Sequence, residues 1–235
     1  AQSESCSHHL FARYWMHNAF LNIDNRKMSK SLGNFFTVRD ILQKYDPQVL
    51  RLFMLSAHYR SPLNFSDKLM ESAKASYARV VNCVSNLNFA LEKEDRQEEL
   101  FEEEGLGKAK AGEYEQAYRR VMDDDFNTAD AISVVFELVR LANTTVNENS
   151  SRAYIRLLKE KIVQLCDVLG LIAERKTEKA QLEISEEEIE EKIAERTKAK
   201  KEKDFALADA IREELLSKGI MLEDTREGVK WTVKS

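Results

Sequence analysis

Residues that break helices are scarce in this chain, which has seven glycines and two prolines among 235 residues. Strand-rich proteins need frequent turns, and Gly and Pro are the residues that most often make them. A chain so poor in both is predicted to be mainly helical. Its hydrophobic fraction of 43% is enough to bury a core, and its charged fraction of 33% indicates a large solvated surface.

Three segments carry apolar residues at steps of three and four, the spacing that gathers them on one face of a helix. They are 66–91, 128–146 and 151–169. Ser66 is a typical residue for the start of the first helix, and Gly170 can end the last. The pattern predicts an antiparallel helical bundle over residues 66–175, in which the charged, Gly-containing segment 92–112 forms an exposed connection.

The first 65 residues are less regular. Aromatic and β-branched side chains mix over 10–24, which fits a strand or a buried irregular segment. The polar segment 25–34 has no apolar period and is predicted to be an exposed loop. Two short helices are expected after it, one starting at Thr37 and the other at Asp46 and Pro47, because these residues favour the first positions of a helix.

A polar linker separates the bundle from a last unit, 176–235. Ser185 and Glu188 have the spacing of a capping box, in which each side chain binds the backbone of the other at the start of a helix. Asp204 can begin a second helix, and two short β-like runs at the end of the chain predict a hairpin. This unit is therefore predicted to combine an α-hairpin with a β-hairpin.

The net charge of −5 is unevenly distributed. Residues 1–65 contain eight Lys or Arg against four Asp or Glu, which gives +4 and leaves −9 for the remaining 170 residues. A polyanion responds to such local basic regions more than to the total charge, so the negative total does not exclude a nucleic-acid partner.

Three cysteines at wide spacing, with no C-x-x-C pair, argue against both a disulfide framework and a zinc ribbon. Cys6, His8 and His9 are spaced too tightly for a usual zinc pair and are expected to be surface residues. Free thiols fit a reducing compartment, so a cytoplasmic location is expected. No stretch approaches the ~20 consecutive apolar residues of a membrane span, so no membrane partner is expected. We further expect a monomer.

The most specific signal in the sequence is a five-residue string in the polar loop, followed by Leu-Gly-Asn. The string is Lys27, Met28, Ser29, Lys30 and Ser31. Two lysines three residues apart on a flexible loop can fold over a triphosphate, where their charge is most useful as negative charge builds on the departing pyrophosphate. Serine hydroxyls can add hydrogen bonds at close approach. A solvated lysine turn without a ligand is the alternative.

This string resembles the KMSKS signature of the class I aminoacyl-tRNA synthetases, and its flanks are similar to the cysteinyl-tRNA synthetases among them. The similar segments, spread over essentially the whole chain, are WMHNAF, NFFTVRDIL, HYRSPLNF, DDDFNTADA and the ending LADA...GIMLEDT...W. The resemblance implies an enzyme that uses ATP with Mg, and zinc, to activate cysteine and transfer it to tRNA(Cys). It also implies the end of a catalytic domain at 1–65, a DALR-type stem-binding bundle at 66–175 and an anticodon-recognition domain at 176–235.

The same resemblance implies roles for the loop. Lys30 and Lys27 are the expected catalytic residues, which contact the phosphates during adenylate formation, and Met28, Ser29 and Ser31 complete the ATP-binding loop. The H-x-G-H signature and the zinc ligands of this family lie upstream of the matching segments, and no metal ligand is expected in this chain. We therefore expect the chain alone to be inactive but to bind tRNA with modest, salt-sensitive affinity.

Basic residues crowd together in the last unit, at Arg196, Lys198, Lys200, Lys201 and Lys203. Such a cluster can hold phosphates while aromatic rings stack on unpaired bases and carboxylates accept from base edges. The predicted tRNA-binding residues are Lys200, Phe205, Asp209, Asp224 and Trp231. For each of them the alternative stays open: a helical hairpin with a solvated lysine face and with Trp231 in its core. Outward arginines of the bundle are further candidates, namely Arg79, Arg119, Arg120, Arg140, Arg152 and Arg156.

Two other functions remain open. A cysteine ligase of the mycothiol pathway looks like this family but acts on an amino sugar, which has no use for a basic, aromatic anticodon reader. A non-catalytic RNA-binding or helical interaction module would retain the loop without its chemistry.

Overall fold

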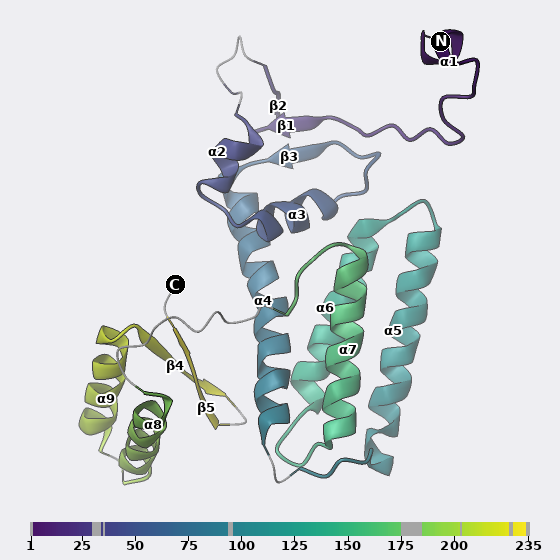
Figure 1. The fold of residues 1–235 in the computed structure, drawn as a ribbon. Coiled ribbons are helices and arrows are strands. Elements are labelled where there is room, and N and C mark those ends of the chain that lie inside the picture. Colours follow the sequence, from purple (N-terminus) through teal and green to yellow (C-terminus); the bar gives the residue numbers. More distant parts are fainter. Residues whose placement is uncertain are drawn as a thin grey trace.

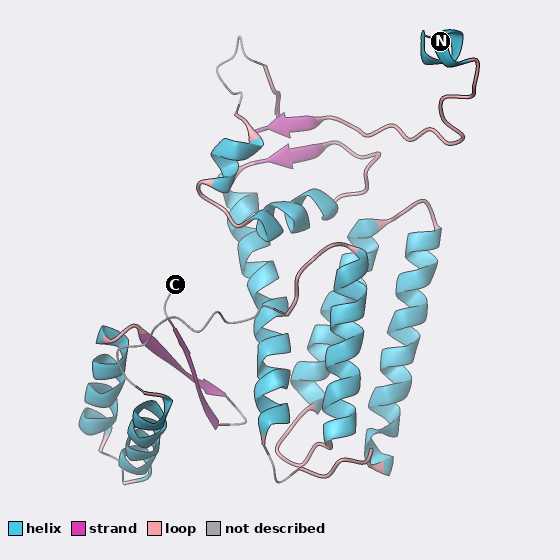
Figure 2. Cartoon of the chain, in the orientation of Figure 1, coloured by secondary structure: helices cyan, strands magenta, loops and turns pink. Residues whose placement is uncertain are grey.

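The computed structural model of the chain describes residues 2–29, 34, 36–93, 96–174, 185–202, 204–225 and 228–233. Helices make up most of this described part, as the shortage of Gly and Pro predicted (Figure 2). The linker predicted after the bundle lies outside these residues, except for Glu174. Within them, no helix combines the length and the apolar composition that a membrane span requires.

A small three-stranded sheet lies at one end of the bundle, with its strands in the order β2, β1, β3 (Figure 1). β1 (Leu21–Ile23) pairs antiparallel with β2 (Arg26–Lys27) and parallel with β3 (Leu63–Phe65). The turn between β1 and β2 places Asp24 and Asn25 at φ of 47° and 61°, a left-handed conformation that Asp and Asn tolerate better than most residues. The predicted polar loop therefore starts as a strand.

The prediction for 10–24 is confirmed in one part and wrong in another. β1 lies at its end, but the residues before β1 form an extended chain that runs from α1 (Gln2–Ser7) to the sheet. Their large apolar side chains are exposed rather than buried: Leu10, Phe11, Tyr14, Trp15, Met16 and Phe20. A sequence pattern shows that such a segment is apolar, but it cannot show whether a neighbouring part of a protein covers it.

Two short helices follow the loop and start where predicted. α2 (Val38–Leu42) begins after Thr37, which forms a capping box with Asp40. α3 (Pro47–Leu55) begins after Asp46, whose carboxylate accepts from a backbone N–H of the first turn at 2.7 Å. Because these caps are local contacts between a side chain and the nearby backbone, the sequence alone could place them.

The helical bundle lies below the sheet in Figure 1. It consists of α4 (Asp67–Glu92), a short 3-10 helix (Glu102–Glu104), α5 (Gly105–Asp123), α6 (Thr128–Thr145) and α7 (Arg152–Val168). α4, α6 and α7 confirm the three predicted helices. The prediction of an exposed connection over 92–112 is wrong from Gly105 onward, where α5 begins. α5 buries only Ala111 and Tyr118, so its apolar pattern is too weak to reveal a helix.

Gly107 allows α5 to approach α7 closely. A Cβ atom at this position would lie 1.9 Å from the hydroxyl oxygen of Tyr154, whose ring is buried and cannot swing away. We expect Gly107→Ala to destabilise the protein by about 2 kcal/mol, because the added atom overpacks the core. In Gly112→Ala the added atom meets nothing within 4 Å, so this control should stabilise the helix by about 0.5 kcal/mol. Urea unfolding measures both variants, and equal stabilities would contradict this packing.

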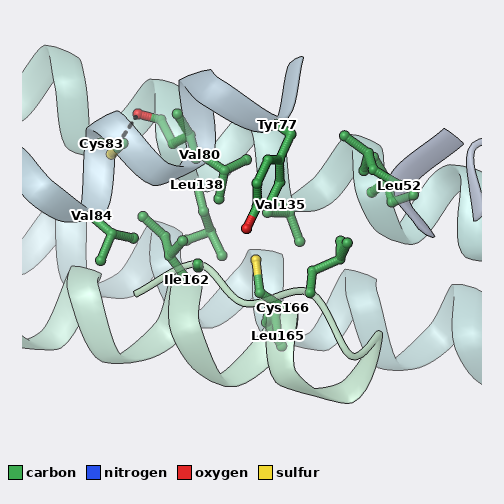
Figure 3. Close-up of a cluster of buried hydrophobic side chains, with 14 of the residues drawn as sticks. Leu52, Tyr77, Val80, Cys83, Val84, Val135, Leu138, Ile162, Leu165 and Cys166 are labelled. Atoms are coloured by element: carbon green, nitrogen blue, oxygen red, sulfur yellow. Dashed lines mark hydrogen bonds between the residues drawn. The ribbon is translucent and has the colours of Figure 1, made fainter. Parts of the chain in front are cut away.

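The main core lies between these helices and α3. Figure 3 shows side chains from α3, α4, α6 and α7 that meet at its centre, among them Leu52, Tyr77, Val80, Cys83, Val84, Val135, Leu138, Ile162, Leu165 and Cys166. The Tyr77 hydroxyl donates to the Ile172 carbonyl oxygen at 2.6 Å and so fastens the chain after α7 to α4. Burial raises the pKa of the Cys83 and Cys166 thiols to about 12, so both stay protonated and act as apolar packing groups. The same core extends without a break into the sheet.

The last unit has a separate core. It consists of α8 (Glu186–Lys201), α9 (Phe205–Ser217), β4 (Ile220–Thr225) and β5 (Gly228–Val233). Its buried residues are Ile189, Ile193, Ile211, Leu215, Ile220 and Leu222. The predicted helix starts at Ser185 and Asp204 are confirmed, and so is the antiparallel terminal hairpin.

Lys230 joins the last unit to the bundle. Its ammonium donates to Ser85 Oγ at 2.5 Å and to Asn86 Oδ1 at 3.4 Å, and both acceptors lie on α4, beside which Figure 1 places this unit. Burial lowers the pKa of Lys230. The last unit therefore rests on α4 through a buried amine that neutral oxygens bind.

Candidate functional site

One side chain ties together the base of the loop that carries the predicted catalytic lysines. The Asn34 carboxamide accepts from the Ser29 N–H at 2.9 Å and donates to the Lys27 carbonyl oxygen at 3.1 Å. The chain segments that enter and leave the loop are thereby held side by side. Lys30 and Ser31 lie outside the described residues, so their roles remain predictions.

Contacts on both sides fix this loop to the rest of the fold. Met28, in the first part of the loop, and Phe36, after it, pack against the main core. The centroid of the Phe36 ring lies 4.7 Å from that of Phe65 on β3. The Asn25 N–H donates to the Asn64 side-chain oxygen at 2.7 Å, which ties the β1–β2 turn to β3. The described residues on the two sides of the loop are thus held in place by the sheet and the main core.

Lys27 lies exposed at the end of β2. An ammonium group there can donate up to three hydrogen bonds to the oxygens of a phosphate. Asn34 was not among the predicted site residues, although it follows the lysine string. An amide can donate and accept at once, which suits a bridge between two backbone segments, but only the fold determines which two segments it joins.

In the last unit, Asp224 binds two of the predicted basic residues. Its oxygens accept from Arg196 Nη1 and Nη2 at 2.8 and 3.0 Å, and one of them also accepts from Lys200 Nζ at 2.8 Å. These hydrogen bonds hold the pKa of Asp224 far below its usual range. Both oxygens are engaged within the unit, so Asp224 acts as a counter-ion to Arg196 and Lys200. Its predicted contact with a base edge stays a prediction.

Arg196 does not lie in an exposed basic cluster, contrary to the expectation from its spacing. Its side chain is only 3% exposed, and its Nε has no hydrogen-bond partner among the described residues. Lys203 lies outside those residues. Among the described residues, the exposed cluster comprises Lys198, Lys200 and Lys201, in the last turn of α8.

Replacing Asp224 with asparagine should destabilise the last unit by about 2 kcal/mol at pH 7, because buried Arg196 loses its carboxylate partner. This loss is smaller than for a fully buried pair, since the Asp224 side chain is 51% exposed. The pKa of Asp224 in the folded state lies below its ordinary value of 3.8. The advantage of the wild type is therefore complete above that value and disappears as the pH falls through the folded-state pKa.

Trp231 fluorescence in a Trp15→Phe background follows unfolding of this unit from pH 7 down to pH 2. The control is Asp209→Asn, which removes one exposed negative charge from the same unit and should change stability little. An equal loss in the two variants would show that total charge, rather than the contact with Arg196, stabilises the unit.

The other predicted RNA-binding residues divide into two groups. Phe205 and Asp209 lie four residues apart on α9, so they share one exposed face, and the Phe205 side chain is 63% exposed and open to stacking. Lys201 and Phe205 flank the short connection between α8 and α9. Trp231 instead packs against the core of the unit, and its Nε1 donates to Glu190 at 3.1 Å. Trp231 is thus only partly exposed, and its predicted role in stacking on a base stays a prediction.

Most of the arginines predicted to face outward from the bundle make contacts within it. Arg152 and Arg156 both pair with Glu98, and the Arg79 guanidinium lies 4.8 Å from the centroid of the Phe136 ring. Arg119 and Arg140 pair with glutamates on their own helices, and Arg120 is exposed. These contacts leave the charges at the surface, where they can still attract a phosphate backbone.

Cys6, His8 and His9 are exposed, as expected of surface residues. Cys6 is exposed on α1, and the chain turns away at His8, whose φ is 57°. Across the part of the chain that the structure describes, no three His, Cys, Asp or Glu side chains come close enough together to hold a metal ion. The zinc that the resemblance implies therefore finds no ligand set among these residues.

Comparison with known proteins finds two matching families and close relatives. Residues 1–75 match the tRNA synthetases class I (C) catalytic domain, and residues 117–174 match the DALR domain. The chain is 55% identical over 232 residues, 99% of its length, to a cysteine–tRNA ligase of Lachnospira eligens, of which it covers 48%. It is 51% identical over 235 residues to a cysteine–tRNA ligase of Lachnoclostridium phytofermentans, of which it covers 49%. The chain thus spans about half the length of the curated relatives it matches.

Proposed function

We propose that this chain belongs to the cysteine–tRNA ligase family and forms part of an enzyme that activates cysteine with ATP and transfers it to tRNA(Cys). The observation that carries the proposal is the 55% identity to a cysteine–tRNA ligase over 99% of the chain. This similarity includes the loop, the bundle and the last unit. We therefore assign to the chain the tRNA-binding surfaces of that enzyme and the loop at residues 27–31 that faces ATP, here called the ATP-facing loop.

The task proposed for the loop is to stabilise charge while cysteine is activated. A carboxylate oxygen of cysteine attacks the α-phosphorus of ATP, which arrives with Mg. The bond from this phosphorus to the bridging oxygen of the β-phosphate breaks, and pyrophosphate leaves with the bonding electron pair. Lys30 is proposed to contact the β- and γ-phosphates of this leaving group, with Lys27 assisting. The bridge made by Asn34 supports this assignment, because it fixes the backbone from which Lys27 projects.

Zinc, if the enzyme uses it as the resemblance implies, is proposed to be held by residues outside this chain, since the described part gathers no ligand set. A thiolate is a far better ligand for zinc than a hydroxyl is, so such a site would distinguish cysteine from serine. The present chain is proposed to contribute the contacts with the phosphates of ATP and with the tRNA.

The surfaces proposed to bind tRNA lie in the bundle and in the last unit. Lys200 is proposed to contact phosphates, Phe205 to stack on an unpaired base and Asp209 to accept from a base edge. Asp224 holds Lys200 in position, because its carboxylate accepts a hydrogen bond from the Lys200 ammonium at 2.8 Å. The proposed domains are the end of the catalytic domain at 1–65, the stem-binding bundle at 66–175 and the anticodon-recognition domain at 176–235.

The two alternative functions gain no support from the two relatives named above, both of which are cysteine–tRNA ligases. These alternatives are the mycothiol-pathway ligase and the non-catalytic interaction module. We further propose that the protein acts as a monomer in the cytoplasm. The three cysteines are free thiols, which suits a reducing compartment.

The test is cysteine-dependent exchange of pyrophosphate into ATP, followed by charging of tRNA(Cys). The complete polypeptide that contains this chain should do both, and the chain alone should do neither, because the loop then has no bound pyrophosphate on which to act. Serine in place of cysteine is the control substrate. A complete polypeptide that fails to exchange pyrophosphate, or that joins cysteine to an amino sugar instead of tRNA, would contradict the proposal.

A further inference from the structure

Asp125, in the loop between α5 and α6, binds residues from a distant part of the chain. Its Oδ1 accepts from the Tyr59 hydroxyl at 2.6 Å and from Arg60 Nη2 at 3.3 Å. Its Oδ2 lies 3.0 Å from Arg60 Nε and 3.7 Å from His58 Nε2. These three partners are consecutive residues in the segment between α3 and β3. One carboxylate of the bundle is thus surrounded by the segment that leads into the sheet.

The partners of Asp125 are themselves ordered by contacts with one another. The His58 and Tyr59 rings are stacked with their centroids 4.8 Å apart. Arg60 Nε donates to the Tyr59 hydroxyl at 2.9 Å, and the Arg60 N–H donates to His58 Nδ1 at 3.2 Å. The segment therefore presents a preformed set of donors to the carboxylate, and little further side-chain entropy is lost when Asp125 binds.

An unusual backbone conformation directs Asp125 toward these partners. Asp125 and Phe126 have φ of 60° and 54°, in the left-handed region that costs a non-glycine residue about 1 kcal/mol or more. The turn is held by the Phe126 N–H, which donates to the Met122 carbonyl oxygen at 3.1 Å. Next to it, the Thr128 hydroxyl donates to the Leu55 carbonyl oxygen at 2.8 Å, so the start of α6 is fastened to the end of α3. Strained turns of this kind persist where the surrounding contacts require them.

The segment that binds Asp125 also supports the base of the ATP-facing loop. The Tyr59 carbonyl oxygen accepts from the Ala19 N–H at 2.8 Å, just before β1. The same segment continues into β3, which pairs with β1, and β1 pairs with β2, where Lys27 lies. Asp125 therefore sits at the point where the bundle meets the sheet that carries Lys27.

Stability alone does not account for this cluster. The side chains of Asp125 and Arg60 are 37% and 66% exposed, and exposed ion pairs contribute about 0.2–1 kcal/mol each. The large buried core already holds α3 and the bundle together. Because α3 and the bundle already pack together, the directional hydrogen bonds of Asp125 mainly fix the orientation of one relative to the other.

We propose that Asp125 is a positioning residue for the transfer step, which sets the orientation of the tRNA-binding bundle relative to the sheet that carries the ATP-facing loop. This inference rests on the proposed function. Asp125 contacts neither ATP nor tRNA in this role, and it acts through Tyr59 and Arg60. Adenylate formation depends on the sheet and its loop, whereas delivery of the tRNA 3′ end depends also on the angle of the bundle. Adenylate formation and tRNA charging should therefore respond differently to the loss of the Asp125 carboxylate.

The experiment uses Asp125→Asn in the complete enzyme, with pyrophosphate exchange and tRNA charging measured separately. Exchange should stay within about 2-fold of the wild type, while kcat/KM for tRNA should fall about 10-fold, because a small misplacement of a reacting end is costly. The matched control is Asp124→Asn, which removes the same charge from the neighbouring, exposed position and should leave both reactions unchanged. Tyr59→Phe removes only the hydroxyl from the other side of the contact and should reproduce the selective loss. The double variant should lose little more than either single variant, since both remove one shared contact.

Several results would overturn the inference. They are an equal loss in exchange and charging, no loss in charging, and a Tyr59→Phe variant that charges normally. If Asp125→Asn fails to fold, as circular dichroism would show, the Tyr59→Phe variant decides between these outcomes. A wild-type enzyme without exchange activity would instead contradict the proposed function itself.

Discussion

A Lys30→Ala variant of the complete enzyme is expected to form cysteinyl-adenylate on the order of 100-fold more slowly than the wild type. The charge of this lysine is most useful when negative charge builds on the departing pyrophosphate, so the loss should appear in kcat more than in KM for ATP. Pyrophosphate exchange, measured across a range of ATP concentrations, separates the two parameters.

Lys27→Ala should have a smaller effect, about 10-fold, because the proposed role of Lys27 is to assist with hydrogen bonds to the same phosphates. Lys44→Ala is the matched control. Lys44 is also an exposed lysine of the first 65 residues, but its ammonium is bound to the Asp67 carboxylate at 3.0 Å. Normal exchange by Lys30→Ala, or an equal loss in Lys44→Ala, would exclude the loop from the chemistry.

The chain alone should lose on the order of 100-fold in affinity for tRNA when salt rises from about 50 mM to about 200 mM. A change of this size corresponds to roughly four phosphate contacts, each of which releases counterions on binding. The net charge of −5 does not prevent this, because the lysines of α8 are concentrated in its last turn. Fluorescence anisotropy of labelled tRNA over a salt series gives the slope.

Lys200→Ala should lower this slope by about one, the change expected when one phosphate contact is removed. The control is Lys218→Ala. Lys218 lies just after the last residue of α9, away from the end of α8, and its ammonium pairs with Glu214 at 3.1 Å. A wild-type affinity that does not depend on salt, or equal slopes for the two variants, would contradict phosphate binding at the end of α8.

Local features of the fold could be predicted from the sequence, because they depend on residues a few positions apart. Thr37, Ser66 and Ser185 each accept a hydrogen bond from the backbone three residues on, so they mark the start of a helix wherever the helix lies. α5 was not predicted, because it packs through a glycine and few apolar residues. The sequence around Gly107 does not indicate that Tyr154 lies against this position.

The candidate site could be predicted only in part, for a related physical reason. The string at Lys27 is a continuous motif and is visible in the sequence, whereas the pairing of Asn34 with its two backbone partners depends on the fold. In the last unit, the nearness of Arg196 to the lysines in sequence led to the wrong prediction that it shares their exposed cluster. Arg196 and Lys200 are four residues apart on one face of α8, which turns both toward Asp224 on β4, and so Arg196 leaves the exposed cluster.

The most direct measurement is binding of the chain to tRNA(Cys) and to the same tRNA with an altered anticodon, at one fixed salt concentration. We expect the cysteine anticodon to bind at least about 10-fold more tightly, because a base that is read through stacking and edge contacts is costly to replace. Phe205→Ala should remove most of this difference while the salt dependence stays. Equal binding of the two tRNAs would mean that the chain only attracts the phosphate backbone, and it would contradict a last unit that reads the anticodon.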